Sequence, residues 1–179
     1  MTHSTIRTGV FGASGYAGLD LIEILTGHPQ VELVFATSGT YAGQPVPGTD
    51  LRYTPPAQAE LTTVDAVFLA LPHKASAPVA AQAAAHGVKV LDLSADLRLD
   101  SPQVYQQWYS TPHPCPDLLP VPYGLVEVNR THLNGIDMVA VPGCYPTCTL
   151  LGLYPLLREG LLQAGAPIIV DAKSGVSGA

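Results

Sequence analysis

The sequence predicts an α/β fold with a Rossmann-like, doubly wound parallel sheet that carries helices on both faces. Three observations lead to this prediction. Short apolar runs alternate with helical patterns, a glycine-rich turn follows the first apolar run, and 47% of the 179 residues are hydrophobic while only 12% are charged. A chain of this length and composition can bury the core of one domain, or of one domain and part of a second.

Six short apolar runs bounded by turn residues are predicted to be buried strands. They comprise residues 6–11, 31–36, 66–71, 88–93, 136–141 and 168–173. Helical patterns occupy residues 19–25, 76–86, 101–109 and 150–159. Residues 37–56 and 111–122 are predicted loops because proline accumulates in both, together with glycine and threonine in the first.

Composition excludes several classes of partner. The net charge is −6 and Lys and Arg form no cluster, so we expect no nucleic acid partner. No apolar run approaches the roughly 18 residues that span a bilayer, so we expect no membrane partner. The first residues lack the layout of a signal peptide, and Cys115, Cys144 and Cys148 fit free thiols in a reducing cytoplasm. We expect no metal, because Cys144 and Cys148 have no second ligand pair nearby.

The glycine-rich turn spans residues 12–18 with the spacing G-x-x-G-x-x-G. It lies between the first predicted strand and the first helix, where glycines let the backbone approach a pyrophosphate and the helix N-terminus donates N–H groups. This context predicts a dinucleotide site rather than a purely structural tight turn. The predicted contacts are Gly12, Ser14, Gly15, Tyr16 and Ala17.

The end of the second strand favours NADP over NAD. NAD sites usually carry Asp or Glu there to bind the ribose 2′-hydroxyl, whereas this chain has Thr37 and Ser38. Hydroxyl groups without a carboxylate suit a 2′-phosphate, although no arginine follows directly. The alternative is an ordinary polar loop.

Cys144 lies in the turn Val-Pro-Gly-Cys-Tyr-Pro-Thr, between the fifth predicted strand and a helical pattern. Backbone N–H groups and the positive end of a helix dipole favour a thiolate in such a turn. A thiolate is a strong nucleophile, so Cys144 is a candidate catalytic residue. The alternative is a small apolar side chain near a turn.

With these residues placed, the chain resembles the N-acetyl-gamma-glutamyl-phosphate reductase family of semialdehyde dehydrogenases. The resemblance covers nearly the whole chain and rests on six motifs in the family's order. They lie at residues 12–18, 70–73, 93–98, 121–127, 142–147 and 174–179.

The resemblance implies that NADPH reduces N-acetyl-glutamyl phosphate, a small acyl-phosphate substrate, to the semialdehyde through a thioester on Cys144, as a step of arginine biosynthesis. It assigns Ser94 and Arg98 to the substrate, although Arg98 could instead form a surface ion pair with Asp96 or Asp100. Leu71, Pro72 and His73 are further predicted cofactor contacts, because they lie at the end of the third predicted strand, where ligands bind in open α/β sheets. His73 could instead be merely a capping residue. The resemblance adds cofactor contacts at Ser174, Gly175 and Ser177.

The resemblance also implies two domains: an NADP-binding Rossmann-like domain at residues 1–143, and at 144–179 the start of an α+β substrate domain that is truncated. Family members are about twice as long, carry a catalytic histidine in their second half, and are expected to form homo-oligomers at full length. We therefore expect the 179-residue chain to bind NADP without turnover, and reductase activity from this chain would contradict that expectation.

Two alternative functions stay open. One is a related reductase of lysine biosynthesis that acts on an aminoadipyl or carrier-bound acyl phosphate and shares Cys144. The other is a dinucleotide-binding module without catalysis, which would have no use for a reactive thiol.

Overall fold

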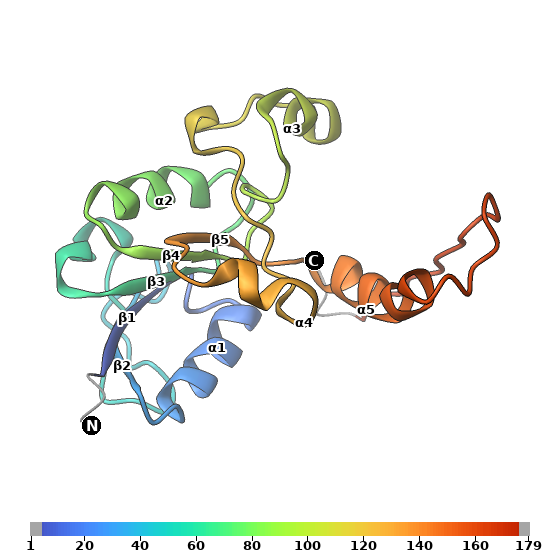
Figure 1. Ribbon diagram of the computed structural model, residues 1–179. Helices are drawn as coiled ribbons and strands as arrows, with labels where there is room; N and C mark the ends of the chain where they lie inside the picture. Colours follow the sequence, from blue (N-terminus) through green and yellow to red (C-terminus); the bar gives the residue numbers. More distant parts are fainter. Residues whose placement is uncertain (1–4, 176–179) are drawn as a thin grey trace.

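The computed structural model describes residues 5–175, which fold around a five-stranded parallel sheet in the order β2-β1-β3-β4-β5 (Figure 1). The structure confirms the predicted α/β class and the first five predicted strands. Two of these have the predicted bounds and three are shorter. The strands are β1 (Ile6–Phe11), β2 (Val31–Ala36), β3 (Ala66–Leu69), β4 (Lys89–Asp92) and β5 (Met138–Ala140).

Five α-helices connect or follow the strands. They are α1 (Tyr16–Thr26), α2 (Ser76–Ala85), α3 (Pro102–Tyr109), α4 (Val126–Asn129) and α5 (Cys144–Arg158). The short helix α4 was not predicted, and α5 begins six residues before its predicted start at residue 150. Pro146 lies within the first turn of α5, where proline is tolerated because its missing N–H would have no partner. Among the described residues, no helix is long and apolar enough to cross a membrane.

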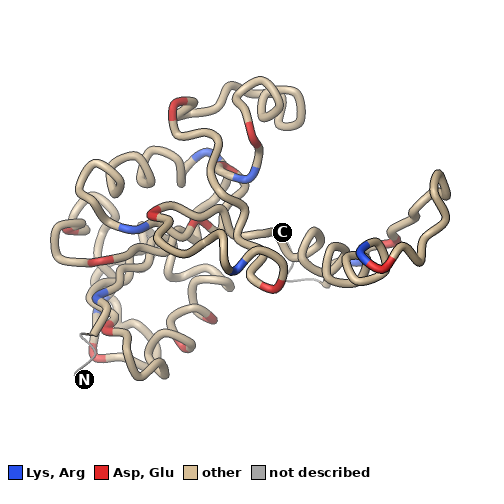
Figure 2. Tube along the Cα trace, viewed as in Figure 1, with Lys and Arg blue, Asp and Glu red and all other residues tan. Residues whose placement is uncertain are grey.

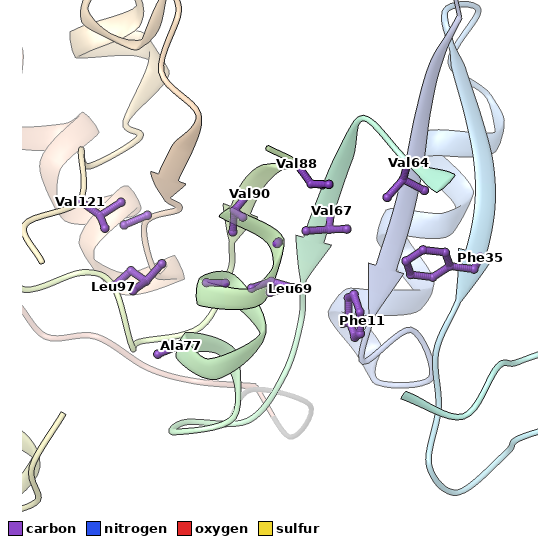
Figure 3. Packing of buried hydrophobic residues seen from close by; sticks show 13 residues of the cluster. Phe11, Phe35, Val64, Val67, Leu69, Ala77, Val88, Val90, Leu97 and Val121 are labelled. Carbon is purple, nitrogen blue, oxygen red and sulfur yellow. The ribbon is translucent and has the colours of Figure 1, made fainter. Parts of the chain in front are cut away.

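Each face of the sheet buries its own apolar cluster, because successive strand side chains point to opposite faces. Phe11, Phe35 and Leu69 belong to the cluster beneath α2 (Figure 3). Val10, Ile22 and other side chains form the cluster beneath α1. The two helices lie on opposite sides of the sheet (Figure 1), which is the doubly wound arrangement that the alternating sequence predicts.

The carboxyl ends of the strands are level with one another. Phe11 pairs with Leu69, Leu69 with Asp92, and Asp92 with Ala140. All pairs are parallel, so the segments that leave these strands emerge at one edge of the sheet. Strand order reverses between β1 and β3, the place where ligands bind in open α/β sheets.

The predicted strand at residues 168–173 is wrong. The chain after α5 has no regular secondary structure up to residue 175, and Ile169 is 87% exposed. A β-strand needs a neighbour to accept and donate its backbone hydrogen bonds. An apolar run alone does not provide one, and α5 instead carries this segment away from the sheet (Figure 1).

Candidate active site

A cavity of about 760 Å³ opens at the switch point between β1 and β3. Nine of the predicted cofactor residues line it: Gly12, Ser14, Gly15, Tyr16, Ala17, Thr37, Ser38, Leu71 and Pro72. Gly18, Asp20, Gly39, Thr40, Pro56 and Ala70 complete the described lining. Its volume lies within the usual range for small-molecule and cofactor sites.

The three glycines of the turn lack a side chain for different reasons. Gly12 has φ +75°, and a Cβ there would stand 2.2 Å from the Ala70 carbonyl oxygen. A Cβ on Gly18 would stand 2.4 Å from the Gly12 carbonyl oxygen, where α1 packs on the turn. A Cβ on Gly15 would meet nothing closer than 3.6 Å. The fold therefore requires Gly12 and Gly18, while Gly15 leaves open space at the start of α1.

The loop after β2 forms the opposite wall of the cavity. Thr37 Oγ1 accepts a hydrogen bond from Gly12 N, and the Ser14 and Ser38 hydroxyls lie 2.8 Å apart. These contacts fix the glycine-rich turn against the end of β2. Within the described lining there is no Lys or Arg, and the single carboxylate, that of Asp20, belongs to α1.

In the segment after β3, some residues line the cavity and His73 packs against α3. Leu71 and Pro72 line the cavity, whereas His73 stacks on Tyr105 at an interplanar angle of 16° and lies against Tyr109. Tyr105 is fully buried, and burial raises the pKa of its phenol above the ordinary range. His73 therefore packs against α3 and is not among the lining residues.

Ser94 follows β4 and is engaged within the protein. Its hydroxyl donates to Asp92 Oδ2 at 2.8 Å and accepts from Asp96 N at 3.0 Å. Asp92 is fully buried, and burial raises the pKa of its carboxyl group. The Ser94 hydroxyl therefore already has two partners within the protein. Its role in substrate binding stays a prediction.

Arg98 joins the ends of β4 and β5. Its Nε donates to the Val141 carbonyl oxygen at 2.9 Å, and its Nη2 donates to the Leu93 carbonyl oxygen at 2.5 Å. Its Nη1 lies 2.8 Å from the position that a Cβ on Gly143 would take. The described ion pairs do not include the alternative partners Asp96 and Asp100 for this guanidinium.

Cys144 is the first residue of α5, directly after Gly143 in extended conformation. Its side chain is exposed. Because Pro146 has no N–H and Thr147 N donates to the Gly143 carbonyl oxygen, the N–H groups of Cys144 and Tyr145 are the donors at this helix start. Val141 N donates to the Asp92 carbonyl oxygen, which ties the approach to Cys144 to the end of β4.

The other predicted thiol and loop residues lie elsewhere. Cys148 is exposed one helical turn along α5, and Cys115 is partly buried against the cluster beneath α2. Ser174 and Gly175 follow α5 in an exposed segment without regular structure, and Ser177 lies outside the described residues. No three His, Cys, Asp or Glu side chains of the described chain could together hold a metal ion.

The site residues thus follow the strand order along one edge. Thr37 and Ser38 follow β2, the glycine-rich turn follows β1, and Leu71 and Pro72 follow β3. Arg98 connects the ends of β4 and β5, and Cys144 follows β5. Sequence reasoning missed Pro56, which reaches the cavity through the path of the loop. It also missed Asp20, which an i+4 count along α1 from Tyr16 could have found.

Two family models match the chain. Residues 7–136 match the NAD-binding domain of semialdehyde dehydrogenase, and residues 144–179 match the semialdehyde dehydrogenase dimerisation domain. Among curated relatives, the N-acetyl-gamma-glutamyl-phosphate reductases of Acidithiobacillus ferrooxidans and Desulforudis audaxviator are each 46% identical to this chain, over 97% of its length and 53% of their own. The chain therefore spans about half the length of the curated relatives it matches.

Solved structures show the same fold at lower identity. The aspartate semialdehyde dehydrogenase II of Vibrio cholerae has a TM-score of 0.66 at 21% identity, covering 87% of this chain and 47% of that one. The aspartate semialdehyde dehydrogenase of Candida albicans, solved with NADP, has a TM-score of 0.61 at 18% identity, covering 87% of this chain and 48% of that one.

Proposed function

We propose the following function for this chain, which belongs to the semialdehyde dehydrogenase family. It carries the nucleotide site and the nucleophile of an NADPH-dependent reductase that converts N-acetyl-glutamyl phosphate to the semialdehyde and phosphate, a step of arginine biosynthesis. The observation that carries the proposal is the alignment of the switch-point cavity and the Cys144 turn along one edge of the sheet. The names of the curated relatives support the substrate.

The residues of the cavity fit a dinucleotide. Gly15 caps α1 without a side-chain hydrogen bond, so the first N–H groups of this 11-residue helix remain for an anion. The open space at Gly15 allows a pyrophosphate to approach the backbone. In this proposal the adenosine half would lie toward Thr37 and Ser38 after β2, and the nicotinamide half would extend past Leu71 and Pro72 toward Cys144; the strand order supports this direction.

NADP is the proposed form of the cofactor. The end of β2 carries hydroxyl groups and no carboxylate that would bind a free ribose 2′-hydroxyl. Thr40 is exposed at the rim of the cavity, and it would offer its hydroxyl to a 2′-phosphate. A tighter dissociation constant for NADP than for NAD would support this choice, and the reverse order would contradict it.

Cys144 would act as the nucleophile. Its thiolate sulfur forms a bond to the acyl carbon while the bond from that carbon to the phosphate oxygen breaks, so inorganic phosphate leaves and a thioester remains. The N–H groups of Cys144 and Tyr145 at the start of α5 would stabilise the oxyanion that forms during the attack. When bound, NADPH would supply the hydride for the thioester carbon; the carbon–sulfur bond then breaks, so the aldehyde leaves and the Cys144 thiolate is restored.

Arg98 would hold the phosphate of the substrate beside this thiol. Its contacts with two backbone carbonyls fix the guanidinium next to Gly143 and leave Nη1 for an anion. His73, Ser94, Ser174, Gly175 and Ser177 keep their predicted ligand contacts as parts of this proposal.

The domain organisation is proposed in the same way. Residues 1–143 would form the nucleotide-binding domain and residues 144–179 the start of the substrate domain. The two matched ranges support this division, and the match to a dimerisation domain supports a homo-oligomer. The exposed apolar side chains of α5, including Leu150 and Leu157, are consistent with a surface that another part of the assembly covers.

The test is an assay of the complete protein that carries this sequence, run in reverse with phosphate, NADP and N-acetyl-glutamate semialdehyde. We expect Cys144→Ser to abolish activity and Cys148→Ser, one helical turn away, to retain it. A fully active Cys144→Ser variant would contradict the thioester mechanism. Activity with only the aminoadipyl analogue would redirect the proposal to lysine biosynthesis.

A further inference from the structure

Asp96 is a fully buried carboxylate on the segment between β4 and α3. Its Oδ2 accepts hydrogen bonds from Ser76 N and Ala77 N, both at 3.1 Å. These are the first two residues of α2, whose own N-cap residue is Ala75 and provides no side-chain cap. Asp96 therefore caps α2 from a distant part of the chain, and the N-terminal dipole of the helix offsets its buried charge.

The other oxygen of Asp96 holds the turn between β3 and α2. Oδ1 accepts from Lys74 N at 2.7 Å and from the Tyr105 hydroxyl at 3.3 Å, and it lies 3.3 Å from His73 Nδ1. Lys74 has φ +74°, a left-handed conformation that costs a side-chain-bearing residue free energy. The hydrogen bond to Lys74 N is a local interaction that can compensate for this strain.

The strained turn forms the wall of the nucleotide cavity. Leu71 and Pro72 line the cavity and are followed directly by His73 and Lys74. A shift of the turn therefore moves the Leu71–Pro72 wall. The end of β2, with Thr37 and Ser38, lies two strands away on the other side of β1 and makes none of the described hydrogen bonds of the Asp96 carboxylate.

We propose that Asp96 is a positioning residue for the nicotinamide half of the cofactor, because it holds the turn at residues 72–74 that carries the cavity wall. The inference rests on the proposed dinucleotide binding. It differs from a general structural role in one respect: loss of the Asp96 carboxylate weakens binding at the β3 side of the cavity and leaves the β2 side unchanged.

The experiment compares two ligands by isothermal titration calorimetry on the 179-residue chain. NADP fills both halves of the cavity, whereas adenosine 2′,5′-bisphosphate fills only the adenosine half. The main variant is Asp96→Asn, which keeps the volume but turns an amide NH₂ group toward backbone N–H donors. We expect the dissociation constant for NADP to rise by about tenfold or more, and that for the bisphosphate to change by less than about twofold.

Two further variants keep the test decisive. Tyr105→Phe retains the carboxylate and the ring stack but removes one donor to Oδ1, together with the 3.1 Å contact between the Tyr105 hydroxyl and His73 Nε2, so it serves if Asp96→Asn does not fold. We expect it to weaken NADP binding by about two- to fivefold with the same selectivity. Asp100→Asn, an exposed carboxylate on the same segment, is the matched control and should leave both ligands unaffected.

The outcomes separate the inference from the proposed function. Wild-type protein that binds neither ligand would overturn dinucleotide binding, and the inference with it. Wild-type protein that binds NADP while Asp96→Asn and Tyr105→Phe bind it equally well would overturn the inference alone. Equal weakening of both ligands would also overturn it, since that result indicates a general loss of structure.

Discussion

Of the three glycines in the turn, Gly15 is the one with open space around an added methyl group, whereas Gly12 and Gly18 have none. This difference allows a test at a single residue. Gly15→Ala meets no protein atom closer than 3.6 Å, so we expect an unchanged free energy of unfolding. The added methyl group occupies the space proposed for the pyrophosphate, so the dissociation constant for NADP should rise by about tenfold. Urea unfolding and calorimetric titration measure the two effects.

Gly18→Ala is the matched control for this prediction. Its new Cβ would stand 2.4 Å from the Gly12 carbonyl oxygen and 2.7 Å from Ala13 Cα, both backbone atoms. We expect a loss of about 1–3 kcal/mol in the free energy of unfolding. A Gly15→Ala variant that bound NADP as tightly as wild type would remove Gly15 from the proposed site.

The effects of substitutions at Gly143 and Arg98 on the free energy of unfolding should be coupled. A Cβ on Gly143 would stand 2.8 Å from Arg98 Nη1, and the guanidinium cannot retreat without losing its bonds to the Leu93 and Val141 carbonyls. We expect Gly143→Ala to lower the free energy of unfolding by about 1–3 kcal/mol. In an Arg98→Ala background the same substitution should cost less, because the displaced group is gone. Chemical denaturation of the four proteins gives the coupling energy, and additive effects would contradict the dependence.

Cys115 should react with alkylating reagents more slowly than an unperturbed cysteine does. Burial raises its pKa, and the nearby Asp96 and Asp117 charges add to the effect. The thiolate fraction below the raised pKa is therefore smaller than that of an unperturbed cysteine. Iodoacetamide should label Cys115 more slowly than free cysteine near pH 8, and the difference should narrow as the pH rises through the raised pKa. Mass spectrometry follows the labelling, and a rate at pH 8 equal to that in strong denaturant would contradict the prediction.

At the scale of elements, α3 has a local start signal that can be removed. Ser101 Oγ accepts a hydrogen bond from Val104 N at 3.3 Å, and Pro102 occupies the first helical position. Ser101→Ala should lower the free energy of unfolding by about 1 kcal/mol. The exposed Ser174, which lies outside any helix or strand, provides the control: Ser174→Ala should leave the free energy of unfolding unchanged. Equal midpoints of urea unfolding for Ser101→Ala and wild type would contradict the capping role.

The sequence predicted the bounds of some elements correctly and those of others incorrectly. The bounds of β1 and β2 were predicted in full, because both segments are rich in β-branched and aromatic residues and are followed by turn residues. The start of α5 was placed too late, since a proline three residues inside a helix has the same sequence signature as a turn. The strand predicted at residues 168–173 failed because pairing depends on a neighbour that local pattern does not reveal.

The candidate site likewise contains features that local sequence reveals and contacts that only the tertiary fold creates. The glycine-rich turn and the Cys144 turn are local features, and their residue types indicate their chemistry. The backbone N–H partners of the Asp96 carboxylate are 19 to 22 residues away in sequence, so its capping of α2 depends on the tertiary fold. Arg98 illustrates the same limit, because two backbone carbonyls hold its guanidinium.

At the scale of the whole molecule, charge and apolar surface are distributed differently. Lys and Arg are scattered along the trace and form no basic face (Figure 2). Apolar exposure is concentrated on α5 and the segment after it, where Leu161 is 70% exposed. This part projects away from the sheet (Figure 1), so it adds little to the core that positions the cavity.

The place of the cavity in the strand order has a consequence during synthesis. All described lining residues lie between Gly12 and Pro72, whereas Cys144 follows 72 residues after Pro72. At typical translation rates this interval lasts roughly 4 to 14 seconds. The part of the chain that lines the cavity is therefore made well before Cys144. A nucleotide that binds the growing chain would stabilise the first strands by mass action while the rest of the sheet is still being translated.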